Sequence, residues 1–138
     1  MSSIEDFATG THFQEVIDDA VVKAAAVTRV LYCSGKVYYD LLKKQTESAV
    51  AHIAIVRIEQ IYPFPEHQLE AIKKKYANAQ EHIWVQEESI NMGAWFYLQT
   101  FHSKVCTSVI ARPQSASPAT GFMKVHLQQQ EDLVNQAF

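Results

Sequence analysis

The sequence predicts an α/β fold with three layers, in which helices cover both faces of a mostly parallel sheet. Residues 53–58 are almost continuously apolar and rich in β-branched side chains, which is typical of a strand buried on both faces. Pro63 and Pro65 then end the strand, because proline has no backbone N–H for a ladder. A helical spacing of apolar residues follows over residues 66–76, and this alternation of strand and helix recurs along the chain.

Residues 1–27 show no strong strand pattern and are interpreted as a lead-in arm before an α/β domain over residues 28–138. The spacing of apolar residues in this arm predicts one loosely amphipathic helix, which includes Phe13, Val16, Ile17, Ala20 and Val21. Its apolar side chains need a surface to pack on, either on the domain or on other parts of a longer protein.

The first half of the domain reads as two strand–helix units. Residues 28–34 form the first strand, and Ser34 is expected to cap a helix that reaches about Glu47. The strand over residues 52–58 is expected to be central in the sheet, and the helix over residues 66–76 ends in lysines that favour the negative end of its dipole.

The second half continues the pattern with strands over residues 82–86 and 106–112 and a helix between them over residues 94–103. A loop rich in serine and proline follows, and a last helix runs from about residue 123 to residue 137. The residues of this last helix expected to face inward are Val125, Gln129, Leu133, Val134 and Ala137.

Composition narrows the function classes. A chain of 138 residues matches one domain, and a net charge of −3 gives no long-range attraction to nucleic acid or to an anionic membrane. No apolar run approaches the roughly 18 residues that span a bilayer. Cys33 and Cys106 lack metal-binding spacing and no secretory signal peptide is present, so a reducing, cytoplasmic compartment is predicted.

Candidate ligand-binding residues lie at the carboxyl ends of the predicted strands, where open α/β sheets bind ligands. These residues are Ser34, Lys36, Arg57 and Arg112. Ser34 and Lys36 open a helix whose free N–H groups could hold a phosphate, although the glycines of a nucleotide-binding loop are missing. The competing interpretation of this segment is a tight turn with a helix cap.

Other polar residues give no complete active site. Glu87 and Glu88 are adjacent on an extended segment, so their side chains point apart, and surface or subunit contact is favoured over acid–base chemistry. The six histidines lack metal-ligand spacing, so no metal site is predicted. Only His126, near the loop after Arg112, is singled out for a test. No catalytic residue is assigned, and a small free-standing enzyme using Glu87, Glu88 or His126 is the least favoured hypothesis.

Six strings, in order along the chain, together resemble one protein family. They are Cys-Ser-Gly-Lys-Val-Tyr-Tyr-Asp-Leu (33–41), Ala-Ile-Val-Arg-Ile-Glu-Gln-Ile-Tyr-Pro-Phe-Pro (54–65), Trp-Val-Gln-Glu-Glu (84–88), Asn-Met-Gly-Ala-Trp (91–95), Arg-Pro-Gln-Ser-Ala-Ser-Pro-Ala (112–119) and Val-His-Leu-Gln-Gln-Gln (125–130). The chain resembles the carboxyl-terminal domain of thiamine-diphosphate-dependent 2-oxoglutarate dehydrogenases, which is similar to the third domain of transketolases.

This resemblance implies a fragment of a homodimeric enzyme of the tricarboxylic acid cycle. The full subunit would bind thiamine diphosphate and magnesium on other domains, pass succinyl groups to a dihydrolipoyl succinyltransferase component, and act in the bacterial cytoplasm or the mitochondrial matrix. For this chain, the resemblance implies no cofactor and a supporting role at domain or dimer contacts. The residues expected at such an interface are Glu59, Gln86, Glu87, Glu88 and Trp95.

The resemblance also suggests an alternative function as an effector-binding module. Some family members respond to AMP or acyl-coenzyme A, and Ser34, Lys36, Arg57 and Arg112 are the positional candidates for such a site. One departure stands out, because Met92 occupies a position where many relatives have glutamine. A thioether at this position removes an amide and weakens any hydrogen-bonding role of the side chain.

Overall fold

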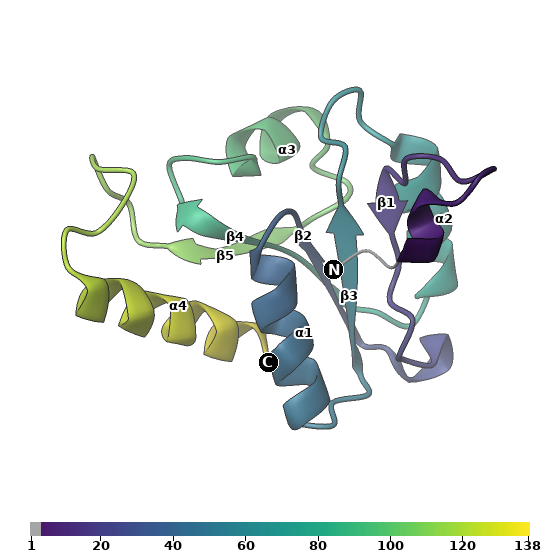
Figure 1. Ribbon diagram of the computed structural model, residues 1–138, viewed down its shortest axis with the longest axis horizontal. Helices are drawn as coiled ribbons and strands as arrows, with labels where there is room; N and C mark the ends of the chain where they lie inside the picture. Colours follow the sequence, from purple (N-terminus) through teal and green to yellow (C-terminus); the bar gives the residue numbers. More distant parts are fainter. Residues whose placement is uncertain (1–3) are drawn as a thin grey trace.

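The computed structural model describes residues 4–138 and contains a five-stranded sheet with the order β1-β3-β2-β4-β5 (Figure 1). The strands are β1 (Val16–Ile17), β2 (Arg29–Cys33), β3 (Ile53–Ile58), β4 (Glu81–Ser89) and β5 (Ser108–Arg112). The helices are α1 (Val37–Glu47), α2 (Glu66–Lys75), α3 (Trp95–Phe101) and α4 (Met123–Ala137), with short 3-10 helices η1 (Ile4–Phe7) and η2 (Ala24–Ala26). Strands β2 to β5 are parallel and only β1 is antiparallel, which confirms the predicted α/β fold.

Strand β3 has the double burial that its sequence predicts, since all six of its residues are buried. It ends at Ile58, before the two prolines, and α2 begins at Glu66. The prediction that β3 is a central strand is confirmed, because β3 lies inside the sheet between β2 and β1, although β2 occupies the middle position. Local sequence does not distinguish these two positions, since Val30–Cys33 of β2 are buried as well.

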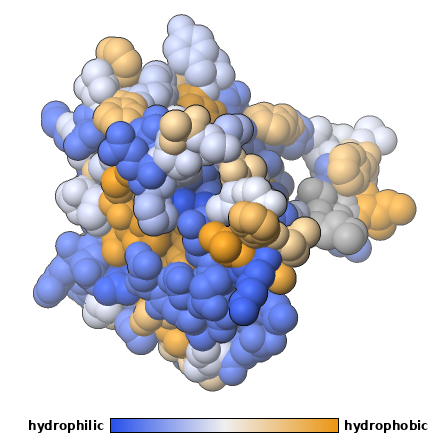
Figure 2. Space-filling model, turned by 90° about the vertical axis from the view of Figure 1, so that its left-hand side faces the viewer, coloured by the Kyte–Doolittle hydropathy of each residue, from blue (hydrophilic) through white to orange (hydrophobic). Residues whose placement is uncertain are grey.

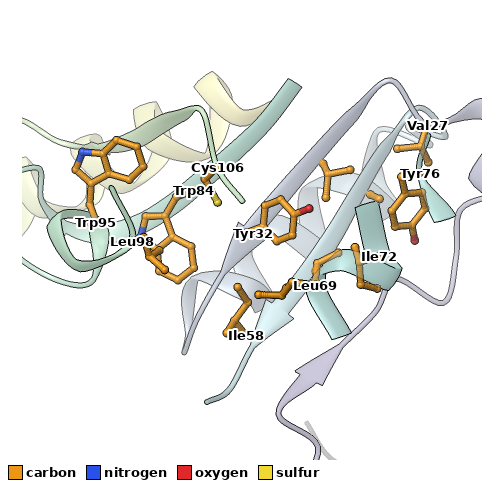
Figure 3. Close-up of a cluster of buried hydrophobic side chains, with 13 residues drawn as sticks. Val27, Tyr32, Ile58, Leu69, Ile72, Tyr76, Trp84, Trp95, Leu98 and Cys106 are labelled. Carbon is orange, nitrogen blue, oxygen red and sulfur yellow. The ribbon is translucent and has the colours of Figure 1, made fainter. Parts of the chain in front are cut away.

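Two apolar cores, one on each face of the sheet, make the three layers. Alternate strand residues such as Tyr32 and Trp84 face α2 and α3, and Figure 3 shows this cluster of side chains. Their neighbours, such as Leu31 and Val85, face α1 and α4 on the other side. Because side chains alternate along a strand, the polar residues that follow Val85 also divide between the two faces. Gln86 contacts Trp84 on the face of α2 and α3, and Glu87 contacts Lys36 on the face of α1 and α4.

The lead-in arm contains a strand where a helix was predicted. Val16 and Ile17 pair antiparallel with Ile58 and Arg57, so β1 covers the edge of β3, and Phe13 remains exposed. The helical spacing of the apolar residues is therefore misleading. The open edge of β3 offers backbone hydrogen bonds that an isolated amphipathic helix cannot use, and this non-local pairing decides the conformation.

Asp19 fastens the arm to the sheet. Its Oδ2 accepts hydrogen bonds from Ile55 N at 2.9 Å and from Gln45 Nε2 at 2.8 Å, and its Oδ1 accepts from the backbone N–H groups of Val21 and Val22. The carboxylate thereby continues, with a side chain, the hydrogen bonding that β1 begins with its backbone. The neighbouring Asp18 accepts a hydrogen bond from the Tyr76 hydroxyl at 2.7 Å.

Two details of the helices differ from expectation. Ser34 does not cap α1, which begins at Val37 after Lys36 and has no side-chain cap. In α4, Leu133 and Ala137 are buried as predicted, but Val125 is exposed. Because β5 is the edge strand, the sheet offers little surface to cover the first turns of α4. Among residues 4–138 no helix has the length and apolar character needed to cross a membrane.

Acidification is expected to destabilise the domain through His82. Burial, followed by the positive charge of Lys73, lowers the pKa of His82, whose Nδ1 lies 3.1 Å from the Tyr32 hydroxyl. The unfolded chain therefore binds more protons than the folded one below the ordinary histidine pKa of about 6.5, and stability falls as the pH falls through this window. Urea unfolding at pH 8 and pH 5 should show a smaller loss for His82→Gln than for the parent chain. An equal loss in both would contradict the assignment, and the exposed His67→Gln serves as the control.

Candidate functional site

Polar side chains from four elements meet at the carboxyl ends of β4 and β5, on the face covered by α1 and α4. We call them the Arg112 network. Its members are Lys36, Asp40, Glu87, Arg112, His126 and Gln130. The strand ends position Glu87 and Arg112. Lys36 and Asp40 lie at the start of α1, and His126 and Gln130 lie on α4.

Lys36 is bound on two sides by carboxylates. Its Nζ lies 2.7 Å from Asp40 Oδ2 and 2.8 Å from Glu87 Oε1. Burial alone would lower the pKa of Lys36, but the hydrogen bonds to Asp40 and Glu87 outweigh it and raise this pKa. Burial would likewise raise the pKa of Asp40, and the bonds from Lys36 and Gln130 lower it instead. The positive charge of Lys36 is therefore balanced by carboxylates of the same chain.

Gln130 connects the acidic and basic halves of the network. Its Nε2 donates to Asp40 Oδ2 and to Glu87 Oε1, both at 2.8 Å. Its Oε1 accepts from Arg112 Nη2 at 2.7 Å. Arg112 Nη1 lies 3.0 Å from His126 Nδ1, while Arg112 Nε is buried without a hydrogen-bond partner among the described residues. The amide thus fastens α4 to α1, β4 and β5 at once.

Arg57 lies in a different set of contacts, at the end of β3. The residue is only 9% exposed, and its guanidinium carbon lies 4.6 Å from the centre of the Tyr38 ring. Its Nε is 3.0 Å from Glu59 Oε1, an ion pair in which the N–H is not aligned on the oxygen, so Nε has no hydrogen-bond partner within residues 4–138. A cavity of about 400 Å³, the Arg57 cavity, opens between Arg57, Tyr38 and the lead-in arm.

The four candidate effector residues take part in different sets of contacts. Lys36 and Arg112 belong to the Arg112 network, whereas Arg57 contacts Tyr38, Tyr39 and Glu59. Ser34 makes no side-chain hydrogen bond in the part of the chain that the structure describes, and it lies outside α1. Lys36 and Arg112 therefore share one set of contacts, and Arg57 lies in another.

The five candidate interface residues divide by burial. Gln86 is 2% exposed and Trp95 is 7% exposed, because both side chains face the core between β4 and α3. Neither can offer its side chain to a partner, so this part of the interface prediction is corrected. Glu88 is exposed, whereas the Glu87 carboxylate contacts Lys36 and Gln130. Glu59 and Glu88 remain available for contact.

Gln86 has an internal role that the sequence pattern did not reveal. Its Oε1 accepts from Trp84 Nε1 at 2.8 Å and from Trp95 N at 3.2 Å. Its Nε2 donates to the carbonyl oxygens of Ser89 at 3.1 Å and Met92 at 2.7 Å. The only signal in the sequence is an amide that directly follows three apolar residues of a buried strand. The amide holds the turn between β4 and α3.

The structure also explains why Met92 is tolerated. The backbone carbonyl of Met92, rather than its side chain, accepts the bond from Gln86. Neighbouring Asn91 exchanges two hydrogen bonds with the backbone of Ser115, at 2.9 and 3.1 Å, and so ties this turn to the loop after β5. The hydrogen bonding of the turn therefore does not depend on the side chain at position 92.

Apolar side chains on the surface mark the faces that are open to contact. They gather in separate groups between hydrophilic ones on the side drawn in Figure 2. The exposed residues at the beginning of α4 are Phe122, Met123, Val125 and Leu127, and Phe96 and Phe101 are exposed on α3. Among residues 4–138 there is no group of three His, Cys, Asp or Glu that could hold a metal ion.

Comparison with known proteins identifies the relatives of this domain. The family model for the 2-oxoglutarate dehydrogenase C-terminal region matches residues 1–138. The chain is 43% identical to the 2-oxoglutarate dehydrogenase E1 component of Cupriavidus necator and 42% identical to that of Haemophilus influenzae. It is also 39% identical to the 2-oxoadipate dehydrogenase complex component E1 of Danio rerio.

The extent of these matches differs between the chain and its relatives. The matches cover 99–100% of this chain but only about 15–16% of each relative. They therefore assign the domain, while most of each relative has no counterpart in these 138 residues. By the full-length match to the family model, this chain belongs to the 2-oxoglutarate dehydrogenase C-terminal family.

Proposed function

We propose that this chain is the supporting C-terminal domain of a homodimeric, thiamine-diphosphate-dependent 2-oxoglutarate dehydrogenase E1 component. In this role it stabilises the dimer and the cofactor-binding domains, while the chemistry takes place elsewhere in the subunit. The whole protein would act on 2-oxoglutarate with the succinyltransferase component as its partner, in the cytoplasm of a bacterium or the mitochondrial matrix of a eukaryote. The observation that carries this proposal is the family match over the entire chain.

The relatives also support a domain that does not select the substrate. The E1 components of Cupriavidus necator and Danio rerio are named for two different substrates, 2-oxoglutarate and 2-oxoadipate. Their identities to this chain are nevertheless similar, at 43% and 39%. A domain that contacted the substrate would be expected to differ more between the two activities.

The paired carboxylates at the strand ends of this domain are engaged within the chain. Magnesium prefers oxygen ligands and is commonly held by one or two carboxylates together with phosphate oxygens. The Asp40 and Glu87 carboxylates, which lie near each other, are already bound by Lys36 and Gln130. We therefore place the cofactor on the other domains of the subunit.

A chimera tests the supporting role. This chain would replace the matching C-terminal region of the Cupriavidus necator E1 component, and dimer mass and turnover of 2-oxoglutarate and 2-oxoadipate would be measured. The expected chimera is dimeric, active and unchanged in its substrate preference, whereas the version truncated before the domain is impaired in dimer formation and turnover. A folded, dimeric chimera with an altered substrate preference would contradict the proposal.

The Arg57 cavity supports a second candidate function, the binding of an anionic effector such as AMP or acyl-coenzyme A. Arg57 lines this cavity beside Glu59, and its guanidinium is nearly buried and stacked on Tyr38. Among the described residues its Nε makes only the misaligned 3.0 Å ion pair with Glu59 and no hydrogen bond. Calorimetric titration of the chimera with AMP and with acetyl-coenzyme A should give heat that Arg57→Gln abolishes. Heat that survives in the variant would reject Arg57 as the site, and Lys43→Gln on the exposed side of α1 is the control.

A further inference from the structure

Arg112 and His126 form a hydrogen bond that requires a neutral imidazole. Arg112 Nη1 lies 3.0 Å from His126 Nδ1. A guanidinium carries N–H donors only and has no acceptor atom, so Nδ1 must accept and cannot carry a proton. The neutral ring therefore carries its proton on Nε2. Protonation of His126 and this hydrogen bond exclude each other.

The charged groups around the Arg112–His126 contact balance one another while His126 is neutral. Arg112 on β5 is the charged group that touches His126 directly. Gln130 links Arg112 to Glu87 of β4 and to Asp40 of α1. Both of these carboxylates are also bound to Lys36. Two cations thus face two carboxylates, and both carboxylates already accept from Lys36 and Gln130. A positive charge on His126 would stand beside Arg112 without a carboxylate of its own.

We propose that the Arg112–His126 contact is an acid-sensitive latch that holds the beginning of α4 against β5. His126 lies in the first turns of α4, and its backbone N–H donates to the carbonyl of Phe122 at 3.1 Å, at the start of the helix. When His126 is protonated, repulsion from Arg112 opens the side-chain contact, and Gln130 then holds Arg112 to α4 by itself. The exposed apolar residues Phe122 and Met123 would move with this end of the helix.

The other end of α4 is not subject to this switch. Leu133 and Ala137 are buried in the core beneath α1, and Arg29 Nη1 donates to the carbonyl of Ala137 at 3.0 Å. We therefore expect a local opening that leaves the second half of the helix in place. The latch is a property of the folded domain and does not depend on the proposed enzymatic role.

Residue-resolved amide hydrogen exchange between pH 8 and pH 5 tests the latch, after correction for the intrinsic pH dependence of exchange. Protection over residues 126–130, whose backbone N–H groups are hydrogen-bonded within the helix, should fall by about tenfold or more on acidification, the factor expected for loss of one hydrogen bond to a charged group. Protection over residues 133–137 should change much less. In His126→Asn, the amide oxygen can take the place of Nδ1 and does not titrate, so the acid response of residues 126–130 should disappear.

Two further measurements make the outcome decisive. Nitrogen-15 spectra of the parent chain at pH 8 should show His126 protonated on Nε2, and protonation on Nδ1 would overturn the proposal even if the variant did not fold. His67→Gln, on the exposed face of α2, should keep the full acid response. An acid response that persists in His126→Asn, or protection in the parent chain that is the same at pH 8 and pH 5, would also overturn the latch.

Discussion

Replacing Gln86 with alanine is expected to lower the free energy of unfolding by about 3–5 kcal/mol, the range of a large buried truncation that also orphans polar groups. The amide makes four hydrogen bonds in a site that is 2% exposed. Its removal leaves a cavity and strips partners from the Trp84 indole N–H and the Trp95 backbone N–H. Urea unfolding of the variant and the parent measures the loss.

Matched variants separate the amide's hydrogen bonds from its volume. Gln86→Leu preserves most of the volume and should still be strongly destabilised, because the two N–H groups remain without acceptors. Gln128→Ala removes an exposed glutamine on α4 that donates to the exposed Asp132, and it should stay within about 0.5 kcal/mol of the parent. A Gln86→Leu variant as stable as the parent would show that packing alone matters at this position.

Gly93 provides a second test of the same site. Its φ of +70° is in the left-handed region, and an added Cβ would lie 3.0 Å from Gln86 Oε1. Gly93→Ala should therefore be destabilising for two reasons, the backbone conformation and the collision with the amide. The collision is absent in Gln86→Ala, so the cost of Gly93→Ala should be smaller in that background, and additive losses would contradict the contact.

Replacing Asp19 with alanine is expected to cost about 2–4 kcal/mol, because each buried donor left without its acceptor costs roughly 1–3 kcal/mol. The carboxylate receives Ile55 N and Gln45 Nε2 on one oxygen and the N–H groups of Val21 and Val22 on the other. Hydrogen exchange should show lost protection at the Ile55 amide together with opening of β1, and urea unfolding gives the energy.

Asparagine at position 19 tests whether both carboxylate oxygens of Asp19 are needed as acceptors, because it keeps the size of the side chain. Its amide has one oxygen, so Asp19→Asn can satisfy one pair of donors and must turn N–H groups toward the other pair. We expect a loss smaller than that of Asp19→Ala but clearly measurable. Asp132→Ala, on the exposed side of α4, is the control. If Asp19→Ala matched the parent within about 0.5 kcal/mol, the arm would not be fastened by this residue.

The candidate site could be predicted from the sequence only in part. Topology correctly brings Lys36, Glu87 and Arg112 to the carboxyl ends of the strands, because parallel strands end at one edge of the sheet. The sequence could not show that Lys36 forms ion pairs with Asp40 and Glu87. Nor could it show that Gln130 links these two carboxylates to Arg112. Those contacts join residues up to 90 positions apart and depend on how α4 crosses the sheet.

Local sequence by itself determined the class of the fold and most of its elements. The apolar run of β3, the prolines after it and the helical spacing of α2 act over a few residues, so their conformational preferences can be read directly. The strings of residues that resemble the 2-oxoglutarate dehydrogenase C-terminal family also lie within short segments, and the family match agrees with them.

Tertiary structure alone decided the strand order, the strand in the lead-in arm and the internal role of Gln86. Val16 and Ile17 pair with β3 because its edge needs hydrogen-bond partners, whatever helical spacing the arm carries. Gln86 is buried because β4 continues to Ser89 and α3 folds back over it. Each outcome depends on partners distant in sequence, and the cost of leaving a buried polar group unpaired selects among arrangements that local propensity cannot distinguish.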